Sequence, residues 1–112
     1  MKIEVDKQGK VTILRPSGDI RVGEGDVALR KAFEAYLEAG DRLFVLNLKG
    51  VRFIDSAGLG ELVASLKRVR EKEGDLNLAE VNKRVSDALV VTQLVKILDV
   101  YATESEAASA YV

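Results

Sequence analysis

One turn in this sequence offers side chains that could take part in chemistry, Asp55-Ser56-Ala57-Gly58-Leu59-Gly60. Its two glycines fall in the first turn of an expected helix, where each costs about 1 kcal/mol relative to alanine. Such departures from local preference are typical of functional sites. Asp55 or Ser56 can cap the helix, and glycines leave room for another molecule to approach closely. The turn is therefore expected either to present the Ser56 hydroxyl to a partner or to act only as a helix start.

Enzymatic chemistry has little support elsewhere in the chain. The sequence contains no His and no Cys, which excludes Cys or His zinc sites and histidine-based catalytic triads. Ile54 occupies the position where a nucleophile elbow requires glycine. The pairs Gly23-Glu-Gly25 and Gly58-Leu-Gly60 lack the third glycine of a dinucleotide motif and the Lys-Ser/Thr of a P-loop. Asp19 and Asp55 could converge at one end of a sheet, but solvated surface aspartates are commoner. We predict no enzyme, no cofactor and no metal.

The elements that must position the turn are an apolar strand before it and an amphipathic helix after it. Residues 43 to 48 form the apolar run of a strand that is buried on both faces. The helix has a buried stripe and is expected to end at Gly74; the stripe comprises Leu59, Leu62, Val63, Leu66 and Val69. We predict that Leu46, Leu62, Leu66 and Phe33 form the core.

The remaining pattern alternates strands with helices. Strands are expected near 2–6, 10–15, 75–81 and 98–102, with a hairpin turn at Gln8-Gly9. Helices are expected from a cap at Asp26 to Ala39, with Gly40 as a left-handed cap, from Asn82 to Val91, and from Thr103 or Ser105 onward. The predicted fold class is α/β, a single domain over 1–112 with a mixed four- to five-stranded sheet and about four helices.

Composition limits the partners of the domain. Seventeen basic and eighteen acidic residues leave a net charge of -1, so no overall field attracts nucleic acid or an anionic membrane. No run of about 18 apolar residues is present, so no direct membrane insertion is expected. The mixed charges of residues 67–73 fit a solvated helix face. A soluble, cytoplasmic protein that recognises its partners by shape and local charge is expected.

The segment Phe53-Ile54-Asp55-Ser56-Ala57-Gly58-Leu59-Gly60, following Leu46-Asn47-Leu48, resembles the signature of anti-sigma-factor antagonists, members of the STAS domain family. A weaker resemblance extends from Gly18-Asp19-Ile20 to Val95-Lys96-Ile97-Leu98. The resemblance implies that a partner serine kinase phosphorylates Ser56. Ala57 stands where many relatives carry a second Ser or Thr, so Ser56 is the only candidate hydroxyl in the turn. Relatives often carry an acidic residue at the position of Arg21.

The resemblance also implies a circuit. The unmodified antagonist binds an anti-sigma factor that is itself an ATP-dependent serine kinase, and this frees the sigma factor. Phosphorylation reverses the binding, because a phosphate adds nearly two negative charges beside Asp55, and a protein phosphatase resets the system. The expected partner-binding residues are Asp19, Arg21, Asp55, Ser56, Ala57, Gly58, Leu59 and Gly60.

Two alternatives remain open at the level of sequence. In the first, the chain is a STAS domain that is never phosphorylated and acts as an accessory subunit on the ATPase of a membrane lipid transporter. In the second, it is a nucleotide-binding domain, which would be revealed by a rise in melting temperature with GTP or ATP.

Overall fold

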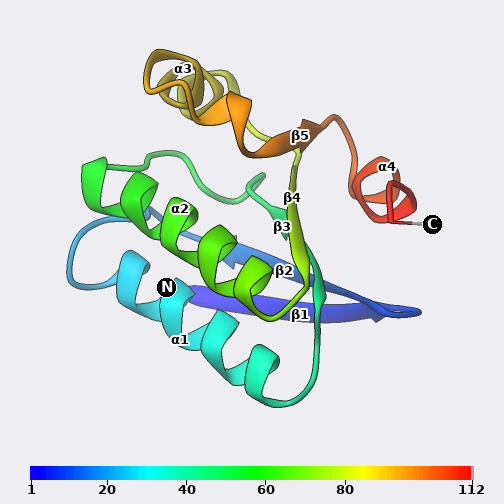
Figure 1. The fold of residues 1–112 in the computed structure, drawn as a ribbon. Helices are drawn as coiled ribbons and strands as arrows, with labels where there is room; N and C mark the ends of the chain where they lie inside the picture. Colours follow the sequence, from blue (N-terminus) through cyan, green and yellow to red (C-terminus); the bar gives the residue numbers. More distant parts are fainter. Residues whose placement is uncertain (112) are drawn as a thin grey trace.

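Five strands form one sheet, and their order in the sheet is the same as their order in the chain (Figure 1). The strands are β1 Lys2–Gln8, β2 Val11–Ser17, β3 Leu43–Asn47, β4 Asp75–Ala79 and β5 Asp99–Tyr101. β1 and β2 pair antiparallel, and the other neighbours pair parallel. The predicted hairpin and mixed sheet are therefore confirmed, with β3 in the centre. The structure is a computed structural model that describes residues 1–111.

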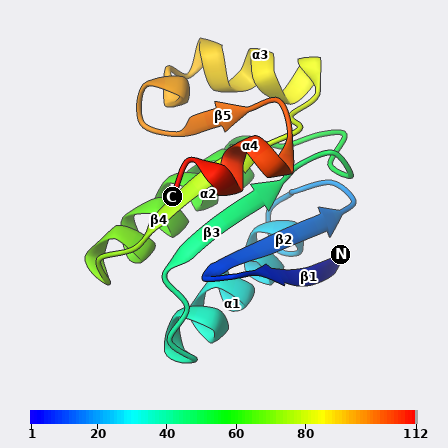
Figure 2. The ribbon, with the colours of Figure 1, turned by 90° about the vertical axis from the view of Figure 1, so that its right-hand side faces the viewer.

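Helices cover the two faces of the sheet unequally. α1 Gly25–Glu38, α2 Ser56–Glu71 and α3 Lys83–Val91 each connect two parallel strands, and their buried side chains join one core cluster. This arrangement follows from right-handed crossovers, which place successive helices on the same face. A short 3-10 helix, η1 Leu94–Lys96, follows α3. The C-terminal helix α4 Glu104–Ser109 packs on the opposite face, as Figure 2 shows.

The larger core lies between the sheet and helices α1 to α3. Phe33 of α1 meets Phe44 of β3 edge to face, with the ring centroids 5.2 Å apart. Leu46 and Leu62 are completely buried, and Leu66 joins the same cluster, so the predicted core is confirmed. β3 is buried from Phe44 to Asn47, because helices cover both of its faces.

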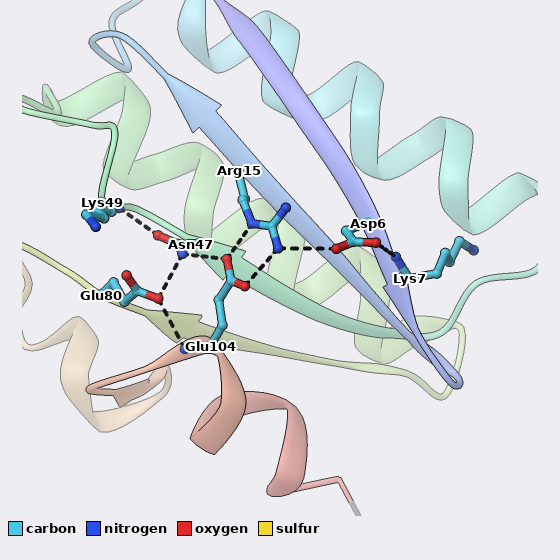
Figure 3. A network of polar contacts seen from close by, with 7 residues as sticks. All are labelled: Asp6, Lys7, Arg15, Asn47, Lys49, Glu80 and Glu104. Carbon is cyan, nitrogen blue, oxygen red and sulfur yellow. Dashed lines mark hydrogen bonds and ion pairs between the residues drawn. The ribbon is translucent and has the colours of Figure 1, made fainter.

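α4 is held against the sheet by a polar network (Figure 3). The Arg15 guanidinium donates to both carboxylate oxygens of Glu104, at 2.6 and 2.9 Å. Asn47 Nδ2 donates to Glu104 at 2.6 Å and to Glu80 at 3.1 Å. A small apolar cluster continues the contact, in which Ala107 and Ala108 pack against β2, β3 and β4. The polar contacts thus tie the first residue of α4 to β2 and β3, and the apolar cluster adds β4.

Most of the predicted helix ends are confirmed. Asn82 caps α3 by accepting from Val85 N at 2.9 Å, and Gly40 follows α1 with a positive φ of 104°. The cap assigned to Asp26 is wrong, because α1 begins one residue earlier, at Gly25. The Asp26 carboxylate accepts from Val27 N, its neighbour, and Glu24 holds the cap position without a side-chain hydrogen bond.

The end of α2 also differs from the expectation. The helix ends at Glu71, three residues before Gly74, and Glu73 adopts the left-handed conformation with φ of 64°. Glycine is required at position 74 because a Cβ there would overlap the carbonyl oxygen of Arg42. Within residues 1–111 no helix has the length and apolar character needed to cross a membrane.

Candidate functional site

Ser56 is the first residue of α2 and lies beyond the carboxyl end of β3, where open sheets generally place their binding sites. The residue is exposed. Among residues 1–111, no hydrogen bond involves its side chain, so the fold does not use the hydroxyl. The predicted layout, with a central strand leading to an exposed Ser56, is therefore confirmed.

Asp55, and not Ser56, caps α2. One carboxylate oxygen of Asp55 accepts from Gly58 N at 2.8 Å, and the other accepts from Val22 N at 3.0 Å. These backbone donors, Gly58 first, lower the pKa of Asp55 below its ordinary value. Of the two caps that the sequence allowed, Asp55 is confirmed and Ser56 is wrong. Asp55 also joins the start of α2 to the loop after β2.

Two loops lie side by side at this end of the sheet. Ile20 N donates to Phe53 O at 2.9 Å, and Asp55 N donates to Ile20 O at 3.1 Å, so a short parallel bridge forms between Ile20 and Ile54. The fold thereby brings the loop with Asp19 and Arg21 next to the turn with Ser56. The two aspartates have separate partners, because Asp19 pairs with Arg21 at 3.2 Å.

The two glycines of the turn have different surroundings. A Cβ on Gly58 would lie 2.5 Å from Ile20 O and 2.6 Å from Ile54 Cγ1, so the expectation that Gly58 leaves room for another molecule is wrong. That space is filled by the chain itself. Gly60 is exposed and has no atom within 4 Å of an added Cβ. Leu59 is half-buried and packs against the larger core, so the open surface at the start of α2 comprises Ser56, Gly60 and parts of Ala57 and Leu59.

Sequence reasoning missed three residues beside this turn, Arg52, Phe53 and Arg84. The guanidinium groups of Arg21, which was expected at the site, and of Arg84 lie over the ring of Phe53, 4.6 and 5.0 Å from its centroid. Together with Asp19 and Arg52 these residues line a cleft of about 210 Å³. Arg84 belongs to α3, and no local pattern links it to Phe53. The predicted helix cap at Asn82 was the one sequence feature that could have indicated Arg84, since it starts α3 near the same edge of the sheet.

Comparison with known proteins gives a consistent result. A family model described as the STAS domain matches residues 2–107. The anti-sigma F factor antagonist of Paenibacillus polymyxa is 31% identical, over 96% of this chain and 92% of the relative. The anti-sigma-B factor antagonist of Bacillus subtilis is 35% identical, over 91% and 94%. Neither name describes an enzyme, in agreement with the prediction of a non-enzymatic protein.

Solved structures give the same fold. A crystal structure of a protein from Thermotoga maritima superimposes with a TM-score of 0.89 at 29% identity, covering 96% of this chain and 92% of that one.

Proposed function

Because this chain belongs to the STAS domain family, we propose that it is an anti-sigma-factor antagonist controlled by phosphorylation of Ser56. In its unmodified form it binds an anti-sigma factor that is a serine kinase, and the sigma factor is released. The kinase transfers a phosphoryl group from ATP to Ser56, which ends the binding. A protein phosphatase removes the group. The names of the relatives support the antagonist role.

The single observation that carries this proposal is the state of the Ser56 hydroxyl. It lies on an exposed first turn, and within residues 1–111 it makes no hydrogen bond, because Asp55 caps the helix instead. A kinase therefore reaches the hydroxyl without breaking any contact of the fold. Ser65, by contrast, is buried and donates to Glu61 at 3.0 Å. Ser56 is the serine of α2 that is suited to modification.

The charge of a phosphate has opposite consequences inside the domain and at its surface. Inside the domain, the amino end of the 16-residue helix α2 favours a negative group, so the fold survives modification. At the surface, the group must be desolvated next to Asp55 before a partner can cover Ser56, and this opposes docking. Phosphorylation is therefore an off switch.

Labelling with a purified anti-sigma kinase and ATP tests the proposal. The expected result is one phosphate, found on Ser56 by mass spectrometry. Ser56→Ala should lose the label and keep its affinity for the kinase, while Ser56→Asp should bind more weakly. Ser105→Ala is the matched control, because Ser105 is also exposed in the first turn of a helix, α4, on the other face of the sheet. This control should label and bind like the wild type.

Three results would contradict the proposal. Phosphate found only on another serine, or equal affinity of the wild type and Ser56→Asp for the kinase, would favour the unphosphorylated accessory subunit of a transporter ATPase. A rise in melting temperature with ATP or GTP alone would favour nucleotide binding.

A further inference from the structure

The cleft beside Ser56, here called the arginine cleft, is lined by Asp19, Arg21, Arg52, Phe53 and Arg84. Its residues come from three separate segments, namely the loop after β2, the loop before α2 and the first turn of α3. It adjoins the Ser56 turn directly, because Val22 N donates to Asp55 and Ile20 N donates to Phe53 O. A partner that covers Ser56 therefore meets the cleft at the same time.

Positive charge is in excess in the arginine cleft. Three guanidinium groups face one carboxylate, that of Asp19, which lies 3.2 Å from Arg21 Nε and 4.0 Å from Arg52 Nε. Among residues 1–111, Arg84 makes neither an ion pair nor a hydrogen bond. Each guanidinium has five N–H donors, and few of them are used here. The cleft thus offers donors and charge that the fold itself does not need.

Two of these arginines are held in place before any partner arrives. Arg21 and Arg84 both lie over the ring of Phe53, a cation–π contact that favours this placement of each guanidinium group. Placing the side chains in advance reduces the entropy that binding must otherwise remove. The two guanidinium groups are consequently suited to the bidentate contact that a carboxylate makes.

The arginines favour a negatively charged group in the cleft, and Asp19 adds a second requirement for any group that binds there. Its Oδ1 is buried and has no hydrogen-bond partner. A buried acceptor without a partner is costly, so a donor supplied by the occupant is favoured at this point. An acidic side chain next to its own backbone N–H supplies both the carboxylate for the arginines and the donor for Asp19. A free phosphate dianion carries about twice the negative charge of a carboxylate, so Asp19 repels it more strongly than it repels an acidic side chain.

We propose that the arginine cleft receives an Asp or Glu side chain of the partner kinase, so that the kinase surface opposite Ser56 is acidic. This inference rests on the proposed function, since it names the chemistry of the partner at the same site. Arg21, Arg52 and Arg84 determine which kinase is recognised, and Ser56 determines when it is released. A kinase with a basic surface at that place is rejected by like charge.

The test is a binding titration with the kinase that phosphorylates Ser56. The titration compares the affinities of the wild type, Arg84→Gln and Lys83→Gln for this kinase. Both residues are exposed neighbours in the first turn of α3, and both variants lose one positive charge, but within residues 1–111 Lys83 pairs only with Asp87, outside the cleft. Arg84→Gln is expected to weaken binding about tenfold and to reduce its salt dependence, while Lys83→Gln stays near the wild type. Equal melting temperatures of the two variants show that folding is unaffected.

Each other outcome has its own meaning. If the wild type is labelled and bound but Arg84→Gln and Lys83→Gln bind equally well, the inference fails and the proposed function stands. If the wild type neither binds nor is labelled, both fail. Titration with inorganic phosphate and with ATP forms the second arm. Saturable binding of either anion that Arg84→Gln abolishes would assign the cleft to a free anion and overturn the inference.

Discussion

Gly58 and Gly60 lie within one turn of α2, yet only one of them has space for a side chain. Alanine at position 58 would force Ile20 and the start of α2 apart, because the added Cβ would lie 2.5 Å from Ile20 O. Gly58→Ala is expected to lower the free energy of unfolding by about 1 to 3 kcal/mol, as overpacking does. Urea denaturation followed by circular dichroism measures the change.

Gly60→Ala is the matched control for that prediction. The position is open and lies inside a helix, so alanine should raise the free energy of unfolding by about 0.5 to 1 kcal/mol. Equal effects of the two substitutions would mean that Ile20 does not pack against Gly58 as described.

For individual residues of the site, the sequence predicted those whose position depends on neighbours in the chain. It did not predict those whose position depends on distant segments. Ser56 and Asp55 lie within one short signature, so their place at the start of α2 follows from local rules for helix ends. The close contact of Gly58 with Ile20 depends on a loop 38 positions earlier, roughly a third of the chain away, and no local rule reports such a contact. Arg84 was missed for the same reason, since its neighbour Phe53 lies on another segment.

Among the elements, α4 is held by a charged contact at its first residue. The Arg15 guanidinium, by donating to Glu104, holds the pKa of that carboxyl below its ordinary value near 4.5. A carboxyl whose pKa is lowered by folding stabilises the native state above its ordinary pKa. This contribution is lost as the pH falls through the lowered value. Acid therefore loosens the attachment of α4.

Thermal melts between pH 3 and pH 7, a range on either side of the ordinary carboxyl pKa, measure this dependence. Glu104→Gln should melt below the wild type at pH 7, and the difference should shrink as the pH falls below the ordinary value. Glu106→Gln is the control, because Glu106 is exposed in the same turn and has no ion pair within residues 1–111. A constant difference across the pH range would show that the Arg15 contact does not stabilise α4.

For the molecule as a whole, α4 is the element that closes the second face of the sheet. Ala107 and Ala108 cover Ile13, Val45 and Ala79, and the Tyr111 hydroxyl donates to Phe44 O at 2.8 Å. A chain shortened to end at Ala102 is expected to lose several kcal/mol of unfolding free energy, since burial contributes about 25 cal/mol per Å². It should also bind the dye ANS through the uncovered face. An unchanged melting temperature and no dye binding would contradict this role.

The alternation of strands and helices was enough to predict the mixed sheet, because successive right-handed crossovers leave few arrangements. The attachment of α4 could not be predicted in this way. Its contacts join Arg15 to Glu104 and Phe44 to Tyr111, pairs that are 89 and 67 positions apart. The alanine-rich sequence of 107–110 indicates a helix but not the face on which it packs.

The order of the strands has a consequence for synthesis on the ribosome. Every strand pairs with the one made just before it, so a growing chain can extend its sheet from β1 to β5 as translation proceeds. The partners of α4, in contrast, have all been made before the helix itself appears. A nascent chain thus exposes the apolar patch around Ile13 and Val45 until residues 103–111 emerge from the ribosome. Translational pausing just before α4 is made would lengthen the time during which chaperones find that patch uncovered.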